Sequence, residues 1–164
     1  MHRLKIVILL FLVFPHISVG QNNTIANIQL ENLDSQKTSL KNYYKHGPLL
    51  IDFWAMWCIP CRSELKVFQA LYEELKDKGI TIAAINIDNP KSIAKVKSFI
   101  SSQNFSFPNF IDPNSEIFRL FNGQNIPYSL IIDTLGNVIK RRTGYEPGDE
   151  LIIKEDLIKL ARKR

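Results

Sequence analysis

The only two cysteines of the 164-residue chain, Cys58 and Cys61, are separated by two residues. They follow an apolar run over residues 49–54, and apolar residues at helical spacing continue over residues 59–78. A strand that leads through C-x-x-C into a helix places a thiol at the helix N-terminus, where free N–H groups and the helix dipole favour the thiolate. The pattern therefore predicts thiol–disulfide exchange.

A purely structural disulfide is the alternative for this pair. A bond between Cys58 and Cys61 would close a loop with only two residues inside it, and the stabilisation that a crosslink gives falls as the loop shortens. A chain of this length can also bury a core that folds without a crosslink. Because the stabilisation expected from such a crosslink is small, a reactive pair is favoured over a structural disulfide.

Asp52 is the third residue that could take part in the chemistry, since it lies six residues before Cys58 inside the apolar run. Alternation along a strand places its side chain on the same face as Trp54, near the strand end that carries the cysteines. A carboxyl buried there would have a raised pKa and could take the proton of Cys61. The alternative is a buried carboxyl with a structural role only.

The first twenty residues have the pattern of a secretory signal peptide. Two positive charges, Arg3 and Lys5, precede nine apolar residues over positions 6–14, and small residues follow up to Gly20. The apolar run is shorter than the roughly 20 residues that span a bilayer. We therefore expect residues 1–20 to be a cleaved leader that exports the protein to the periplasm or another extracytoplasmic space, with an uncleaved membrane anchor as the alternative.

The rest of the chain has the length and charge of one globular domain. We expect a disordered N-terminus over residues 21–26 and a single domain over residues 27–164. Without the two charges of the leader, the chain carries 19 basic and 16 acidic residues. This small surplus of positive charge gives little support to a nucleic-acid partner. We also expect the protein to be a monomer.

Hydrophobic periodicity and turn residues predict the elements that would position the cysteines. They are a β-hairpin, alternating strands and helices, a second hairpin and a final helix, over residues 27–40, 49–54, 59–78, 80–87, 92–101, 107–111, 115–120, 128–133, 138–143 and 150–161. On the final helix we expect the core-facing residues to be Leu151, Ile152, Ile158 and Ala161. The order predicts an α/β fold with a central mixed β-sheet flanked by helices, an N-terminal β-hairpin and a βα insert.

Two segments of the sequence resemble the thioredoxin superfamily. Residues 52–61, D-F-W-A-M-W-C-I-P-C, closely resemble the active-site segment of thioredoxins. Residues 126–133, I-P-Y-S-L-I-I-D, followed by L-G-N-V, resemble the strand that begins at the cis-proline of that family. The leader, the hairpin and the insert over residues 89–112 narrow the resemblance to the extracytoplasmic TlpA/ResA-like thiol–disulfide oxidoreductases, across residues 27–160.

The resemblance implies a thioredoxin-like fold, and it agrees with the roles that the helix start gives to the cysteines. We expect Cys58 to be the more exposed thiol, which attacks a substrate disulfide, and Cys61 to resolve the mixed disulfide. Pro60 cannot supply an N–H to the first helical turn, so it restricts which donors reach the sulfurs. Trp57 would supply an apolar platform for the substrate beside Cys58.

The proline of the second segment is also expected in the site. The resemblance implies that the Ile126–Pro127 peptide is cis, a geometry found almost only before proline, and that it lies against the cysteine pair. The backbone of Ile126 would then be free to bind an extended substrate segment.

The resemblance also bears on the proton acceptor. Thioredoxins carry an acid at the position of Asp52 and usually pair it with a lysine on the neighbouring strand, where this sequence has Ala84. Many TlpA-like proteins instead carry an acid after that strand, which makes Asp88 and Asn89 further candidates.

The function that the resemblance implies is that of a protein-disulfide oxidoreductase. We expect it to reduce disulfides in exported proteins, for example apocytochromes c, with a membrane electron donor as partner and no cofactor. A disulfide oxidase of the same fold is the alternative for the direction. A metal-binding module would need more ligands than His46 adds to the cysteines, so we expect no metal. A peroxidase and a redox-sensing binding module are the remaining alternatives.

Overall fold

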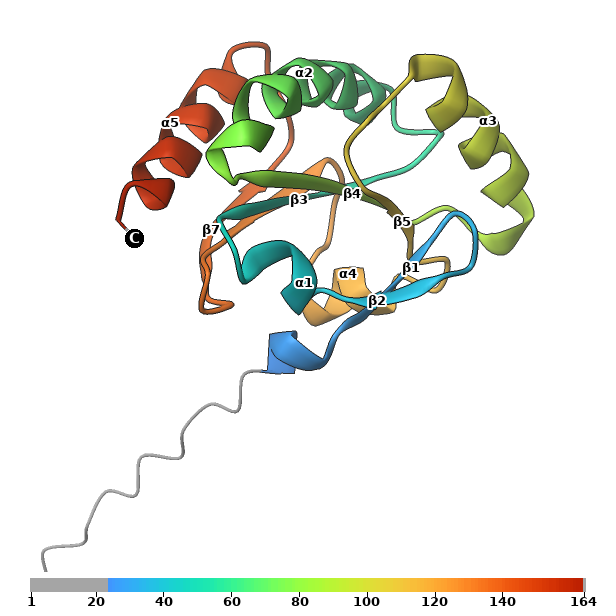
Figure 1. Ribbon diagram of the computed structural model, residues 1–164. Helices are drawn as coiled ribbons and strands as arrows, with labels where there is room; N and C mark the ends of the chain where they lie inside the picture. Colours follow the sequence, from blue (N-terminus) through green and yellow to red (C-terminus); the bar gives the residue numbers. More distant parts are fainter. Residues whose placement is uncertain (1–23, 164) are drawn as a thin grey trace, which may run out of the picture.

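The computed structural model describes residues 24–163 (Figure 1), so the expected leader over residues 1–20 lies outside the described residues. Across residues 24–163 no helix combines the length and the apolar character needed to cross a membrane.

The described chain begins with a short ordered segment. A 3-10 helix spans Thr24–Asn27, and its Ile25 is buried in the same apolar cluster as Tyr44. The expectation of disorder over residues 21–26 is therefore wrong for its last three residues, because an apolar side chain anchors them on the core. Residues 21–23 lie outside the described residues.

Seven strands form one mixed sheet in the order β2-β1-β5-β4-β3-β6-β7. Their bounds are β1 Gln29–Asn32, β2 Lys37–Ser39, β3 Leu49–Trp54, β4 Thr81–Asn86, β5 Asn109–Ile111, β6 Tyr128–Ile132 and β7 Val138–Thr143. β3, β4 and β5 are parallel, whereas the β1–β2, β1–β5, β3–β6 and β6–β7 pairs are antiparallel. The sheet agrees with the predicted mixed architecture, including the N-terminal hairpin.

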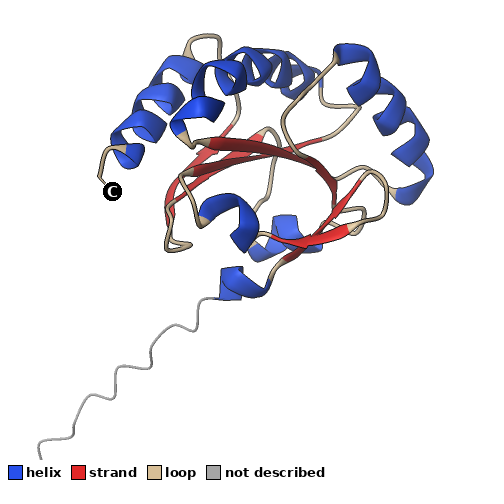
Figure 2. Ribbon diagram, viewed as in Figure 1, coloured by secondary structure: helices blue, strands red, loops and turns tan. Residues whose placement is uncertain are grey.

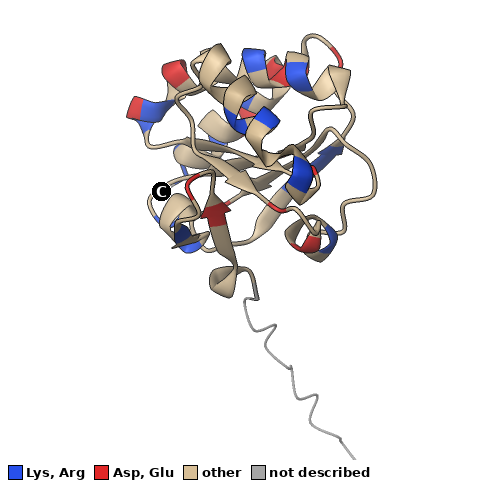
Figure 3. Ribbon diagram, turned by 90° about the vertical axis from the view of Figure 1, so that its right-hand side faces the viewer, with Lys and Arg blue, Asp and Glu red and all other residues tan. Residues whose placement is uncertain are grey.

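Helices cover both faces of the sheet (Figures 1 and 2). One face carries α2 (Ile59–Leu75), α3 (Ile93–Gln103) and α5 (Asp149–Ala161), and the other carries α1 (Lys41–Tyr44) and α4 (Glu116–Leu120). Short 3-10 helices follow α2 at Lys76–Lys78 and precede α3 at Pro90–Ser92. On the side of the molecule that presents α3, basic and acidic residues are interspersed (Figure 3).

Strand β3 lies at the centre of the sheet and is buried along its whole length. Its side chains alternate between two apolar clusters: Leu50 and Trp54 pack beneath α2, while Ile51 and Phe53 pack on the face of α1 and α4. Trp54 is a core residue, as expected. The same alternation turns Asp52 towards α2, the helix that carries the cysteines.

The last helix meets the core with only part of the predicted face. Ile153 and Leu157, four residues apart, are the buried residues of α5, whereas Leu151 and Ile152 are 66% and 48% exposed. The predicted core face was therefore wrong for Leu151 and Ile152, whereas Ile158 and Ala161 are half-buried and pack against the apolar cluster, as expected. Apolar residues occur on several sides of this helix, so periodicity alone does not decide which side meets the sheet.

Candidate active site

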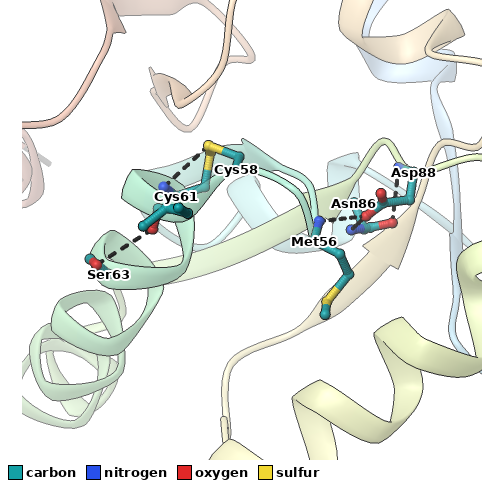
Figure 4. Close-up of a disulfide and its surroundings, with 7 residues drawn as sticks. Met56, Cys58, Cys61, Ser63, Asn86 and Asp88 are labelled. Carbon is teal, nitrogen blue, oxygen red and sulfur yellow. Dashed lines mark hydrogen bonds between the residues drawn. A yellow bond between two sulfur atoms is a disulfide. The ribbon is translucent and has the colours of Figure 1, made fainter.

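The two cysteines form a disulfide at the start of α2, with their Cα atoms 5.3 Å apart (Figure 4). Cys58 is the N-cap residue of the helix, and its Sγ accepts a hydrogen bond of 3.2 Å from the backbone N–H of Cys61. A thiolate at the same place would accept this N–H and would lie at the positive end of the helix dipole. The local structure therefore favours ionisation of Cys58 in the reduced protein.

The surroundings of the pair are asymmetric. Cys58 retains 5% of its accessible surface and Cys61 retains none, so the expected order of exposure is confirmed. Trp57 and Ile59, on either side of Cys58, are each 69% exposed. A partner sulfur can therefore reach the first cysteine across an apolar rim, whereas the buried second cysteine is closed to it.

The Ile126–Pro127 peptide is cis, as predicted. Pro127 is buried directly before β6, and Tyr128 pairs with Phe53 near the end of β3. The proline therefore lies at the sheet end from which the chain leaves for Cys58. Its carbonyl oxygen accepts a hydrogen bond of 2.8 Å from the backbone N–H of Gly144, which fixes the connection after β7 at the same end.

Asp52 is completely buried, and neither carboxyl oxygen has a hydrogen-bond partner among residues 24–163. It pairs with Ala84 on β4, so the neighbour expected in place of a lysine is confirmed. Burial, and then the nearby carboxyl of Glu64, raise the pKa of Asp52 well above its ordinary value. The structure thus places a buried carboxyl with a raised pKa beneath the start of α2.

Glu64 is a second buried acid that the sequence interpretation missed. It lies three residues after Cys61 on the inner face of α2 and is 2% exposed. Burial, followed by the negative charge of Asp149, raises the pKa of Glu64 to about 8, while Arg142 acts in the opposite direction. Its position on the apolar stripe of α2, one turn after a cysteine, is the sequence feature that could have identified it.

The two other candidate acceptors have different surroundings. One carboxylate oxygen of Asp88, Oδ2, accepts hydrogen bonds from the backbone N–H of Met56 at 2.7 Å and from the side-chain amide of Asn86 at 2.8 Å (Figure 4). It thereby ties the loop before the cysteines to the end of β4. Asn89 is exposed, and its side chain accepts a hydrogen bond from the N–H of Lys91 at the start of a 3-10 helix.

The histidine that was considered as a further metal ligand lies away from the cysteines. His46 is exposed before β3, at the opposite end of that strand from Cys58. Between residues 24 and 163, no three histidine, cysteine or acidic side chains gather in a way that could hold a metal ion.

The chain is similar in sequence to known proteins over most of its length. Residues 21–141 match the family model described as the AhpC/TSA family. Thiol-disulfide oxidoreductase ResA from Bacillus thuringiensis subsp. konkukian is 31% identical over 125 residues, which are 76% of this chain and 70% of that protein. ResA from Bacillus subtilis is 26% identical over 127 residues, which are 77% of this chain and 69% of that protein.

Solved structures are similar over most of the chain. A putative thiol:disulfide interchange protein DsbE from Chlorobium tepidum has a TM-score of 0.75 and 24% identity, with 82% of this chain and 92% of that chain covered. StoA from Bacillus subtilis has a TM-score of 0.64 and 23% identity, with 78% of this chain and 95% of that chain covered.

Proposed function

The chain belongs to the AhpC/TSA family and is a thiol–disulfide oxidoreductase with a thioredoxin-like fold, and from this premise we propose that it reduces disulfides of exported proteins, such as apocytochromes c, outside the cytoplasm. One observation carries the proposal: Cys58 lies at the accessible start of α2, while Cys61 is buried in a region that also holds two acids with raised pKa values. The first thiol can exchange with a substrate, and the second has proton acceptors in its own surroundings.

The reaction consumes one dithiol and one substrate disulfide. The thiolate of Cys58 attacks a substrate sulfur, which forms a mixed disulfide and releases the first substrate thiolate to take a proton from water. Cys61 then gives its proton to Asp52 or Glu64 and attacks Sγ of Cys58, which breaks the mixed disulfide and releases the second substrate thiolate. Two electrons have passed to the substrate, and the protein is left with the Cys58–Cys61 disulfide.

Side-chain and backbone groups around the sulfurs would bind the substrate. Trp57 forms an apolar platform beside Cys58, and the backbone of Ile126, directly before Pro127, pairs with an extended segment of the substrate. Pro60 limits the hydrogen-bond donors that reach the sulfurs from the first helical turn.

The direction of exchange follows from the balance between dithiol and disulfide. A protein that stabilises its reduced, thiolate form is a strong oxidant. Here the surroundings of Cys61 are apolar, and the burial that raises the pKa values of Asp52 and Glu64 also opposes negative charge on the sulfurs. This favours the disulfide in the protein and therefore reduction of the substrate.

Partners and location complete the proposal. The chain has only two cysteines, so a second dithiol protein must reduce the disulfide after each turnover, and we place this donor in the membrane. The pattern of residues 1–20 supports export, with cleavage after Gly20 and an uncleaved anchor as the alternative. The N-terminal residue of the exported protein distinguishes the two, since cleavage would leave Gln21.

A measurement of the reduction potential tests the direction. The protein is equilibrated in glutathione buffers, and the reduced fraction is determined by alkylation and mass spectrometry. We expect a value nearer the roughly −270 mV of thioredoxin than the roughly −120 mV of the oxidant DsbA. A value near that of the oxidant would instead support the oxidase alternative.

Trapping experiments test the roles of the cysteines. Cys61→Ser should accumulate a covalent adduct with a disulfide substrate such as insulin, because the resolving thiol is missing. Cys58→Ser should form no such adduct, since the accessible nucleophile is missing. Full insulin reduction by both variants would refute the assignment of the cysteines, whereas no reduction by the wild-type protein would make a binding module the better description.

A further inference from the structure

A row of polar side chains crosses one face of the sheet from β3 to the edge strand β7. Asp52 pairs with Ser129 on β6, and Ser129 in turn pairs with Arg142 on β7. Directly opposed residues of neighbouring strands point to the same face of a sheet. Arg142 therefore lies on the face of Asp52, beneath α2 and α5. Its neighbour Arg141 pairs with Leu130, which belongs to the apolar cluster of the opposite face.

Arg142 is held in place by the first residue of α5. Its guanidinium forms an ion pair with Oδ1 of Asp149, and the two side chains are only 21% and 23% exposed. The other oxygen of Asp149 accepts a hydrogen bond of 3.0 Å from the backbone N–H of Glu146. The edge of the sheet and the start of α5 are thus joined by a largely buried pair of opposite charges.

The two charges of this ion pair influence the ionisation of the Glu64 carboxyl. Four elements bring charged or titratable groups to that carboxyl: Asp52 from β3, Arg142 from β7, Asp149 from α5 and Tyr145 from the connection between β7 and α5. Arg142 alone among these four can carry a positive charge. It stabilises the ionised carboxylate of Glu64, whereas the charge of Asp149 destabilises it.

We propose that Arg142 and Asp149 are positioning residues for the redox reaction, which set from opposite sides how readily Glu64 is ionised when Cys61 must lose its proton. The inference rests on the proposed function, because it assigns control over the proton acceptor of that same site. A protonated Glu64 cannot take the proton of Cys61, so the ionised fraction limits the resolving step through this carboxyl. Arg142 keeps that fraction available near neutral pH, and Asp149 both orients the guanidinium and restrains its effect.

The test measures how the rate of the resolving step depends on pH. The preformed mixed disulfide between Cys58 and a small chromogenic thiol is isolated at low pH, and thiol release is followed between pH 5 and pH 10. Arg142→Gln should move the midpoint of the profile upward by about one pH unit, as expected for one charge removed from a partly buried site. Asp149→Asn should move the midpoint downward.

Matched variants separate this effect from a loss of structure. Arg141→Gln removes the same charge from the adjacent position on the opposite face and should leave the midpoint in place. Arg142→Lys keeps the charge and should restore most of the wild-type profile. In a Glu64→Gln background, Arg142→Gln should cause no further shift.

Two results would overturn the inference. One is a shift in the same direction for Arg142→Gln and Asp149→Asn, and the other is a shift for Arg142→Gln no larger than that for Arg141→Gln. If Arg142→Gln does not fold, Asp149→Asn and Arg142→Lys still give the sign and the charge dependence. Failure of the proposed function would look different, because the wild-type protein would then release no thiol at any pH.

Discussion

The buried carboxyl of Glu64 should make the stability of the oxidised protein fall as the pH rises. Its pKa is about 8 in the folded protein and 4.5 for an exposed glutamate. Between these values the folded protein binds one more proton than the unfolded chain. The contribution of this group is therefore fully present below about pH 4.5 and is lost as the pH rises through about 8.

Glu64→Gln removes the proton while it keeps the size and shape of the side chain. A pKa difference between 4.5 and about 8 corresponds to up to about 5 kcal/mol of stability, or about 1.4 kcal/mol per pH unit inside this window. Any packing cost of the glutamine is the same at every pH. The variant should therefore lose stability less steeply than the wild type as the pH is raised, whatever its stability at low pH.

Denaturant unfolding of the oxidised protein at several pH values between 4.5 and 9 measures this slope. The cysteines do not contribute, because they are joined in a disulfide. Asp52 is present in both proteins, and because the charge of Glu64 contributes to its raised pKa, Glu64→Gln changes its titration in the direction that also makes the slope less steep. Glu155→Gln, which removes an exposed acid from α5, is the control and should give a curve parallel to that of the wild type. Parallel curves for Glu64→Gln and the wild type would refute the reasoning, because they would mean that burial does not hold the proton on Glu64.

Three further outcomes are expected. Asp52→Asn should slow release of the second thiol from the mixed disulfide at neutral pH by about 100-fold, the lower end of the contribution of a positioned proton acceptor. An unchanged rate would leave Asp52 a structural carboxyl. Asp88→Ala should leave the N–H of Met56 without its acceptor and destabilise the protein by about 1–3 kcal/mol. Amide hydrogen exchange at Met56 should become faster. The control is Asn89→Ala, which removes a side-chain contact at the start of the 3-10 helix and should not change that exchange rate. Gly136→Ala would place a Cβ 2.9 Å from Ile25 and 3.0 Å from Tyr44, at a residue with a φ of +87°. This variant should lower the unfolding midpoint more than Gly144→Ala does, because Gly144 has a similar φ of +83° but open space around it. Equal losses would show that backbone strain alone accounts for the effect.

Local patterns were sufficient to predict the elements that hold the cysteines. The apolar run over residues 49–54 coincides with β3, because a strand buried on both faces has no polar interruption except Asp52. The cis peptide before Pro127 and the neighbour Ala84 of Asp52 were expected from the resemblance to thioredoxins, not from a local pattern, and both are found in the structure.

The parts that were missed depend on contacts between distant segments. The raised pKa of Glu64 depends on burial and on Arg142 and Asp149, which lie more than 70 residues further along the chain. The packing phase of α5 depends on how Ile153 and Leu157 meet the sheet face, and several phases satisfy its apolar pattern. Helix α1 was also missed, because its four residues are too few to show a helical period.

Ile59 and Pro60, the two residues enclosed by the disulfide, lie outside both apolar clusters while the sulfurs themselves are buried. Replacing either residue would remove little buried area, yet in a two-electron couple a change of 30 mV needs only about 1.4 kcal/mol. Mutation can therefore alter the electron affinity of the couple while the scaffold stays intact. This separation gives natural selection a route by which a lineage can change from donating electrons to accepting them without passing through unstable intermediates.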